Sequence, residues 1–209
     1  MSEPECNKYK VGTLKSLIYV PNYITKQEQA FLMDKIYSDS TAWHQLKKRR
    51  LQNWGGNPKA GGMVQEPLPE WLTLVSKRLF SSSFFPSPPN HGLINEYDGN
   101  EGIMPHKDGP IYYPKVAIIT LNGSAMLSFR KTLQDEIESE VLLEPCSLII
   151  FQEEAYENYF HGIADTFVDT ISEKTVNVPH LEKGLQVQRT LRISITMRVV
   201  PTIQEENAN

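Results

Sequence analysis

Short apolar runs, several of them alternating with polar residues, recur at near-regular intervals through the second half of the chain. A period of two residues is typical of β-strands, and turn signals such as Asn122-Gly123 separate the runs. Many short strands at near-regular spacing favour a β-sandwich or jelly roll. The strands expected from this pattern are Leu93–Tyr97, Val116–Leu121, Ala125–Phe129, Glu140–Leu143, Leu148–Phe151, Tyr159–Ile163 and Leu191–Val200.

The first part of the chain predicts one strand followed by two helices. Leu14–Val20 is apolar and ends before Pro21, and residues 25–28 have the sequence of a capping box that begins an amphipathic helix to about Tyr37. Residues 67–80 predict a second helix with Pro69 in its first turn. The apolar residues expected to face the core are Phe31, Leu32 and Ile36 in the first helix and Trp71, Leu74, Val75 and Leu79 in the second.

Two stretches lack a regular apolar period. Residues 43–62 are basic at Lys47–Arg50, contain Trp43 and Trp54, and are interrupted by glycines. They predict either a lid that offers cations to phosphates and rings to bases, or a solvent-exposed hairpin whose tryptophans anchor it to the core. Their composition alone favours neither. Residues 164–189 are polar and irregular, and we expect them to be partly disordered.

Composition limits the classes of protein that fit. A chain of 209 residues with 40% hydrophobic residues can form one domain with a full core. The net charge of −4 is uneven, because residues 1–60 carry ten Lys/Arg and five Asp/Glu, whereas residues 61–209 carry eleven and twenty. Cys6 and Cys146 lie far apart in dissimilar surroundings, which favours a reducing compartment over a disulfide framework. The N-terminal residues do not resemble a signal peptide, and no apolar run approaches the ~18 residues of a membrane span, so we expect no membrane association.

The candidate chemistry begins with His106 and Asp108, which form an H-x-D motif. Residues i and i+2 of an extended strand point to the same side, so a further histidine would complete a two-histidine, one-carboxylate face that suits Fe(II). The motif is weak by itself, but His161 follows the apolar run at 142–151 and can supply the third ligand. Residues 192–198 alternate strictly, and their polar face holds two arginines and two hydroxyl residues. That face predicts either the solvated side of a strand or a pocket that binds a dicarboxylate through a guanidinium. His91 lacks a spaced carboxylate partner and is not expected to be a ligand.

Taken in order, these motifs resemble the AlkB family of Fe(II)- and 2-oxoglutarate-dependent dioxygenases. The matching elements are N-x-Y at 95–97, H-x-D at 106–108, H-G at 161–162 and R-x-S-x-T-x-R at 192–198. The flanking stretches R-L-Q-N-W-G-G at 50–56 and G-I-M-P-H-K-D-G-P at 102–110 are similar to one animal and plant branch of the family. The resemblance runs from about Ile18 to Pro201.

The resemblance implies a mainly β fold with N-terminal helices and a double-stranded β-helix (jelly-roll) core. It implies one dioxygenase domain over residues 1–209, with the first strand, helices and candidate lid at about 14–90, the β-helix at about 91–201 and a frayed tail at 202–209. The expected iron ligands, which are also the catalytic residues, are His106, Asp108 and His161. The residues expected to bind 2-oxoglutarate are Arg192 at its distal carboxylate, Tyr97 through its hydroxyl, Asn95 and Ser194, with Arg198 steadying the cosubstrate or Asp108.

The resemblance also implies an activity. Fe(II), 2-oxoglutarate and O₂ would oxidise an N-methyl group of alkylated DNA or RNA, releasing succinate, CO₂ and formaldehyde. The family builds substrate lids from the region before the iron-binding strand, so the candidate substrate-binding residues are Lys47, Lys48, Arg49, Arg50 and Trp54. We expect a monomer in the cytoplasm and nucleus that binds single-stranded or duplex nucleic acid.

Two departures from the family pattern concern the binding of the cosubstrate and of the base rather than the iron ligands. Ser194 stands where many members have Asn, and Pro110 stands where the bacterial DNA-repair member has an aspartate that meets the base. Three hypotheses therefore remain: a nucleic acid demethylase, a dioxygenase acting on a protein side chain or small molecule, and a nucleic-acid-binding module with an idle iron site.

Overall fold

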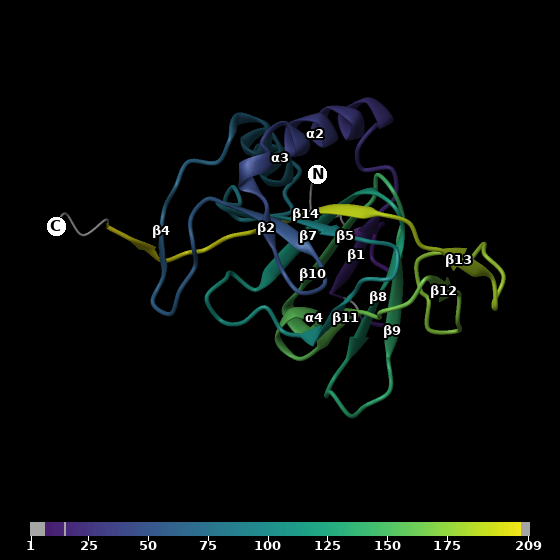
Figure 1. Cartoon of the computed structure of the whole chain (residues 1–209). Coiled ribbons are helices and arrows are strands. Elements are labelled where there is room, and N and C mark those ends of the chain that lie inside the picture. The colour runs from purple at the N-terminus through teal and green to yellow at the C-terminus, as the bar shows by residue number, and fades with distance from the viewer. Residues whose placement is uncertain (1–6, 15, 206–209) are drawn as a thin grey trace.

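Two antiparallel β-sheets form the body of the protein in the computed structural model, which describes residues 7–14 and 16–205 (Figure 1). The large sheet has the order β1 (Leu17–Val20), β10 (Leu148–Gln152), β7 (Lys115–Asn122), β14 (Arg192–Arg198), β5 (His91–Tyr97), β3 (Arg50–Trp54) and β2 (His44–Gln45). The small sheet has the order β6 (Ile103–His106), β11 (Phe160–Ile163), β8 (Ala125–Arg130) and β9 (Ser139–Leu143). This architecture confirms the predicted jelly roll.

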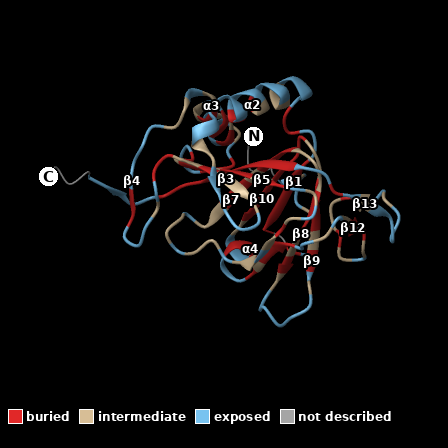
Figure 2. Cartoon of the chain, in the orientation of Figure 1, coloured by how far each residue is buried: buried red, intermediate tan, exposed pale blue. Residues whose placement is uncertain are grey.

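The large sheet is buried on both faces because apolar clusters cover each side of it. On β10, Leu148 and Ile150 pack into the cluster under the helices, whereas Ile149 and Phe151 pack into the cluster between the sheets. The near-continuous apolar run of this strand follows from double burial. Figure 2 shows the same layering, with buried residues along the strands and exposed residues on the outer sides of the helices and at loop tips.

Two helices cover the outer face of the large sheet (Figure 1). Helix α2 (Lys26–Ser38) begins with the predicted capping box, in which the Glu28 backbone N–H donates to Thr25 Oγ1 at 3.1 Å and the Thr25 N–H donates to the Glu28 carboxylate at 2.7 Å. Helix α3 is Glu70–Ser81, and Pro69 is its N-cap rather than a residue of its first turn. Shorter helical segments are η1 (Ser40–Ala42) and α4 (Glu153–Glu157).

The predicted core faces of the helices are partly wrong. Phe31 is 45% exposed and Leu74 is 55% exposed. In α2 the residues four apart, Leu32 and Ile36, point to the sheet, and Phe31 lies about 100° round the helix from Leu32. In α3 the inward face is set instead by Leu72, Val75 and Leu79, of which Leu72 was not predicted, while Trp71 is half-buried.

The C-terminal strands form where the sequence predicts them, with ends that differ by at most two residues, and the first strand starts at Leu17 rather than Leu14. Residues 50–54 are strand β3 of the large sheet and pair with β2, which agrees with the hairpin interpretation of residues 43–62. The expectation of irregular structure at 164–189 is wrong, because this segment contains the paired strands β12 (Val168–Thr170) and β13 (Gln186–Gln188). In that segment Arg189 donates twice to the buried Asp169, both at 2.6 Å, a pairing that alternation of apolar residues cannot reveal.

The end of the chain is also more regular than expected. Strand β15 (Ile203–Gln204) pairs in parallel with β4 (Met63–Val64), and residues 206–209 lie outside the described part of the chain, as does Cys6. Cys146 is buried with a free thiol in the turn before β10. Among the described helices, none combines the length and apolarity needed to cross a bilayer.

Candidate metal centre and cosubstrate pocket

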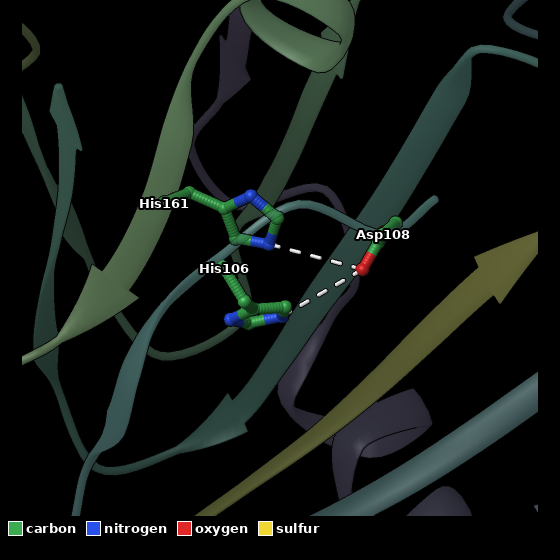
Figure 3. Close-up of side chains that lie close together, drawn as sticks. All are labelled: His106, Asp108 and His161. Carbon is green, nitrogen blue, oxygen red and sulfur yellow. Dashed lines mark ion pairs between the residues drawn. The ribbon is translucent and has the colours of Figure 1, made fainter. Parts of the chain in front are cut away.

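Three potential metal ligands converge between the two sheets (Figure 3). His106 ends β6, and His161 lies directly opposite it on the antiparallel neighbour β11. Asp108 follows β6 by two residues and turns its carboxylate toward both rings. Asp108 Oδ1 is 3.7 Å from His106 Nε2 and 3.9 Å from His161 Nε2, and the ligand atoms all lie within 4.8 Å of one another. The cross-strand register thus brings together two histidines that are far apart in sequence.

Both imidazoles present the nitrogen that a metal needs. His106 Nδ1 lies 2.9 Å from the Met104 carbonyl, and since only an N–H can pair with a carbonyl, Nε2 keeps its lone pair. His161 is 5% exposed, and its ring packs 4.5 Å from the ring of Phe151. Burial lowers the pKa of His161 to about 3, with Asp108 opposing and His106 adding to this shift. His161 is therefore neutral at physiological pH, which is the form that binds metal.

Arg198 holds Asp108 as a carboxylate. Its Nε donates to Oδ2 and its Nη2 to Oδ1, both at 3.0 Å. Burial pushes the pKa of Asp108 upward, but the charge of Arg198 and the two imidazoles outweigh burial and hold that pKa below its ordinary value. The paired guanidinium also fixes the direction of the carboxylate, so Arg198 acts on the candidate iron ligand.

A cavity of 210 Å³ extends from the two histidines to Arg192 on β14. Arg192 is 3% exposed and donates to Thr120 Oγ1 at 2.9 Å and to Ser194 Oγ at 3.3 Å. Its Nε has no hydrogen-bond partner, and none of the described carboxylates forms an ion pair with it. Burial lowers the pKa of Arg192 to about 10. A buried cation with an unused donor fits a carboxylate ligand, and the two-histidine, one-carboxylate set fits Fe(II).

Strand β5 supplies the other predicted cosubstrate residues. Tyr97 lies opposite Arg192, and Asn95 lies opposite Ser194, in the β14–β5 register. The Tyr97 ring is 5.8 Å from the Arg192 guanidinium. All residues of β14 are buried, so the polar face of this strand lines the cavity instead of meeting solvent. The sequence did not predict that Thr120 contacts Arg192. The one indication in the sequence is that Thr120 places a hydroxyl within the apolar run 116–121.

The structure separates the basic residues that the sequence grouped as one substrate-binding cluster. Lys48 forms an ion pair with Asp165, and Arg50 forms one with Glu96 while stacking 4.3 Å from the Trp43 ring. Arg49 alone of the group lines the cavity, and Lys47 is exposed.

Trp54 follows the hairpin interpretation rather than the base-stacking one. Its ring packs edge-on against Trp71 at 6.3 Å, and its Nε1 donates to Gln52 Oε1 at 3.1 Å. His91 is likewise internal: it is buried beside Asn53, whose Oδ1 lies 2.9 Å from His91 Nε2, and it is not part of the metal set.

The chain belongs to the 2OG-Fe(II) oxygenase superfamily, whose family model matches residues 13–198. It is therefore a 2-oxoglutarate-dependent dioxygenase that uses Fe(II), 2-oxoglutarate and O₂. Within that superfamily it is a member of the AlkB family. It is 37% identical over 207 residues to the probable RNA/DNA demethylase ALKBH6 of Danio rerio, a match that covers 92% of this chain and 88% of the relative.

The chain is also similar to more distant proteins in sequence and in fold. An uncharacterized protein, L905, of Acanthamoeba polyphaga mimivirus is 26% identical over 92% of this chain and 90% of its own length. Two solved structures share the fold. OsALKBH1 has a TM-score of 0.62 at 16% identity, covering 90% of this chain and 99% of that one. HygX of Streptomyces hygroscopicus, solved with nickel and 2-oxoglutarate, has a TM-score of 0.54 at 10% identity, covering 91% and 85%.

Proposed function

We propose that this dioxygenase removes N-methyl groups oxidatively from alkylated DNA or RNA. His106, Asp108 and His161 hold the iron, and Arg192 binds the distal carboxylate of 2-oxoglutarate. The observation that carries the assignment is that one cavity is lined both by the two histidines of the three-ligand metal site and by a buried arginine without a carboxylate partner. A ligand that chelates metal through one end and carries a carboxylate at the other matches these groups.

The residues around the cavity have distinct tasks in this scheme. Iron supplies the activation of O₂ when it is bound, with 2-oxoglutarate oxidised to succinate and CO₂. Arg192 and the Tyr97 hydroxyl anchor the distal carboxylate, and Asn95 and Ser194 fix its orientation. Arg198 keeps Asp108 ionised and directed at the iron site. The apolar wall around Phe151 and Leu127 limits water at the reacting end.

Two observations support nucleic acid as the substrate, namely the name of a relative and the position of the basic β2–β3 hairpin. The Danio rerio relative is named a probable RNA/DNA demethylase, and the basic β2–β3 hairpin of this chain lies beside the cavity, with Arg49 in its lining. Single-stranded or duplex nucleic acid would then approach over the hairpin, where Lys47 is exposed. Arg50 and Trp54 anchor the hairpin through Glu96 and Trp71. The expected setting is a monomer in the cytoplasm and nucleus.

A panel of modified oligonucleotides tests the substrate. The purified protein, Fe(II), 2-oxoglutarate and O₂ are incubated with single-stranded and duplex DNA and RNA that carry N-methylated bases, and loss of the methyl group is read by mass spectrometry. We expect demethylation of at least one oligonucleotide by the wild type and none by His106→Ala.

Two other results would replace the proposal. Stimulation of 2-oxoglutarate turnover by peptides or small molecules, but by no oligonucleotide, assigns a different substrate class. Oligonucleotide binding without any 2-oxoglutarate turnover assigns a binding module with an idle iron site.

A further inference from the structure

Arg49, at the tip of the β2–β3 hairpin, lines the cavity with its side chain. Arg49 Nε donates to Asn95 Oδ1 at 3.2 Å, and its guanidinium carbon lies 5.8 Å from the centre of the Tyr97 ring. Both contacted residues line the cavity that also holds Arg192. With Oδ1 of Asn95 engaged by Arg49, the Asn95 side-chain nitrogen remains a donor for a ligand.

The strand register explains this position. Arg50 pairs with Glu96 between β3 and β5, so Arg49 precedes the ladder at the level of Tyr97, which pairs with Arg192 between β5 and β14. A row of three side chains thus crosses the large sheet on its inner face: Arg49, Tyr97 and Arg192. The Tyr97 ring stands 5.8 Å from each guanidinium. Two positive charges therefore flank the tyrosine whose hydroxyl is assigned to the cosubstrate carboxylate.

The neighbours of Arg49 are neutralised, whereas Arg49 is not. Lys48 pairs with Asp165 in the segment after β11, and Arg50 pairs with Glu96. Among the described residues no carboxylate forms an ion pair with Arg49, whose recorded partners are an amide oxygen and an aromatic face. The tip itself, closed by a hydrogen bond from the Leu46 N–H to the Arg49 carbonyl at 2.8 Å, lies outside the sheet ladder. Lys48 and Arg49 contact parts of the chain outside the hairpin, at Asp165 and Asn95.

We propose that Arg49 is a second arginine that binds 2-oxoglutarate, and that its binding couples the hairpin tip to occupancy of the cavity. The inference rests on the proposed assignment of this cavity to the cosubstrate. 2-Oxoglutarate is a dianion, and its negative charge holds Arg49 in the position beside Tyr97 that the structure shows. Release of succinate removes that charge and frees the tip. Arg49 is thereby assigned to the cosubstrate and not to a nucleic acid phosphate.

Calorimetric titration with 2-oxoglutarate, in the presence of Mn²⁺ in place of iron, measures the effect without turnover. Arg49→Ala should raise the Kd for 2-oxoglutarate about tenfold, the factor that 1.4 kcal/mol represents. Arg49→Lys should fall between this variant and the wild type, because an ammonium keeps the charge but not the forked donor set. Lys77→Ala, which removes an exposed cation from α3, is the control for net charge and should match the wild type.

Hydrogen exchange of the amides at 46–49 supplies the second readout. Adding 2-oxoglutarate should protect these amides in the wild type and in Lys77→Ala, but not in Arg49→Ala. A Kd within twofold of the Lys77→Ala value, in an Arg49→Ala protein with an unchanged melting temperature, overturns the proposal. So does a flattened salt dependence of oligonucleotide binding at unchanged cosubstrate affinity, which would make Arg49 a phosphate contact.

Arg192→Ala separates a failure of this inference from a failure of the pocket assignment. If Arg192→Ala abolishes 2-oxoglutarate binding while Arg49→Ala does not weaken it, the pocket stands and the role of Arg49 is wrong. If neither variant changes the Kd, the cavity does not bind the cosubstrate and both assignments are wrong.

Discussion

Replacing Arg192 by methionine should leave the stability of the apo-protein nearly unchanged and abolish cosubstrate binding. Burial that lowers the pKa of Arg192 from 12.5 to about 10 disfavours its charged form by roughly 3 kcal/mol, at 1.36 kcal/mol per pKa unit. Methionine has similar length and no charge to desolvate. Against this, the hydrogen bonds that the charged guanidinium donates to Thr120 and Ser194 are lost, at about 1.5 kcal/mol each. The two effects nearly cancel, so the melting temperature should change by less than ~2–4 °C, the shift that 1 kcal/mol produces in a chain of this size.

The loss of 2-oxoglutarate affinity should be much larger than any change in stability. Two hydrogen bonds from a guanidinium to a carboxylate, at about 1.5–3 kcal/mol each, correspond to a Kd roughly 10²–10⁴-fold higher. Scanning calorimetry of the apo-protein and titration calorimetry with Mn²⁺ and 2-oxoglutarate measure the two effects, with Lys77→Met as the control for net charge. A lower melting temperature together with intact 2-oxoglutarate binding would show that Arg192 is structural and would refute the reasoning.

Three further perturbations test the metal site and the fold. His161→Ala should remove the rise in melting temperature that Mn²⁺ produces in the wild type by binding the folded state, and an unchanged rise would exclude His161 as a ligand. Asp169→Asn should lower the free energy of unfolding by about 3–5 kcal/mol in urea titrations, because it leaves the buried Arg189 without its carboxylate; a loss below 1 kcal/mol would contradict this. Burial lowers the pKa of His91 to about 4 in the folded protein, so the unfolded chain binds a proton at this residue at higher pH than the folded protein does. The contribution of His91 to the free energy of unfolding is therefore complete above about pH 6.5 and is lost as the pH falls toward 4. His91→Gln should flatten this part of the stability–pH curve, and parallel curves for the two proteins would contradict the assignment.

Part of the candidate metal site and the alternation of strand 192–198 could be predicted from the sequence, because local order encodes them. An H-x-D pair at a strand end places His106 and Asp108 on one side. Strict alternation in 192–198 places Arg192 and Arg198 on the polar face. The structure then decides what periodicity could not, namely that this face lines a cavity instead of solvent.

The missed features depend on contacts between distant segments. The pairing of Asp169 with Arg189 joins two polar residues, each of which is typical of an exposed loop, so the segment between them was expected to be irregular. The strand β3 contains Arg50, whose charge suggests solvent until Glu96 of the neighbouring strand is placed opposite it. Thr120 contacts Arg192 only through the β7–β14 pairing, which the local pattern of apolar and polar residues does not reveal.

The most direct test of the central claim is the balance of products formed from one methylated oligonucleotide. Succinate, formaldehyde and demethylated base are quantified in the same single-turnover reaction with Fe(II), 2-oxoglutarate and O₂. The wild type should form equal amounts of the three products, and Asp108→Ala should form none of them at matched folded fraction. Succinate formed without formaldehyde or demethylated base, for every oligonucleotide tried, would contradict the claim that this cavity demethylates nucleic acid.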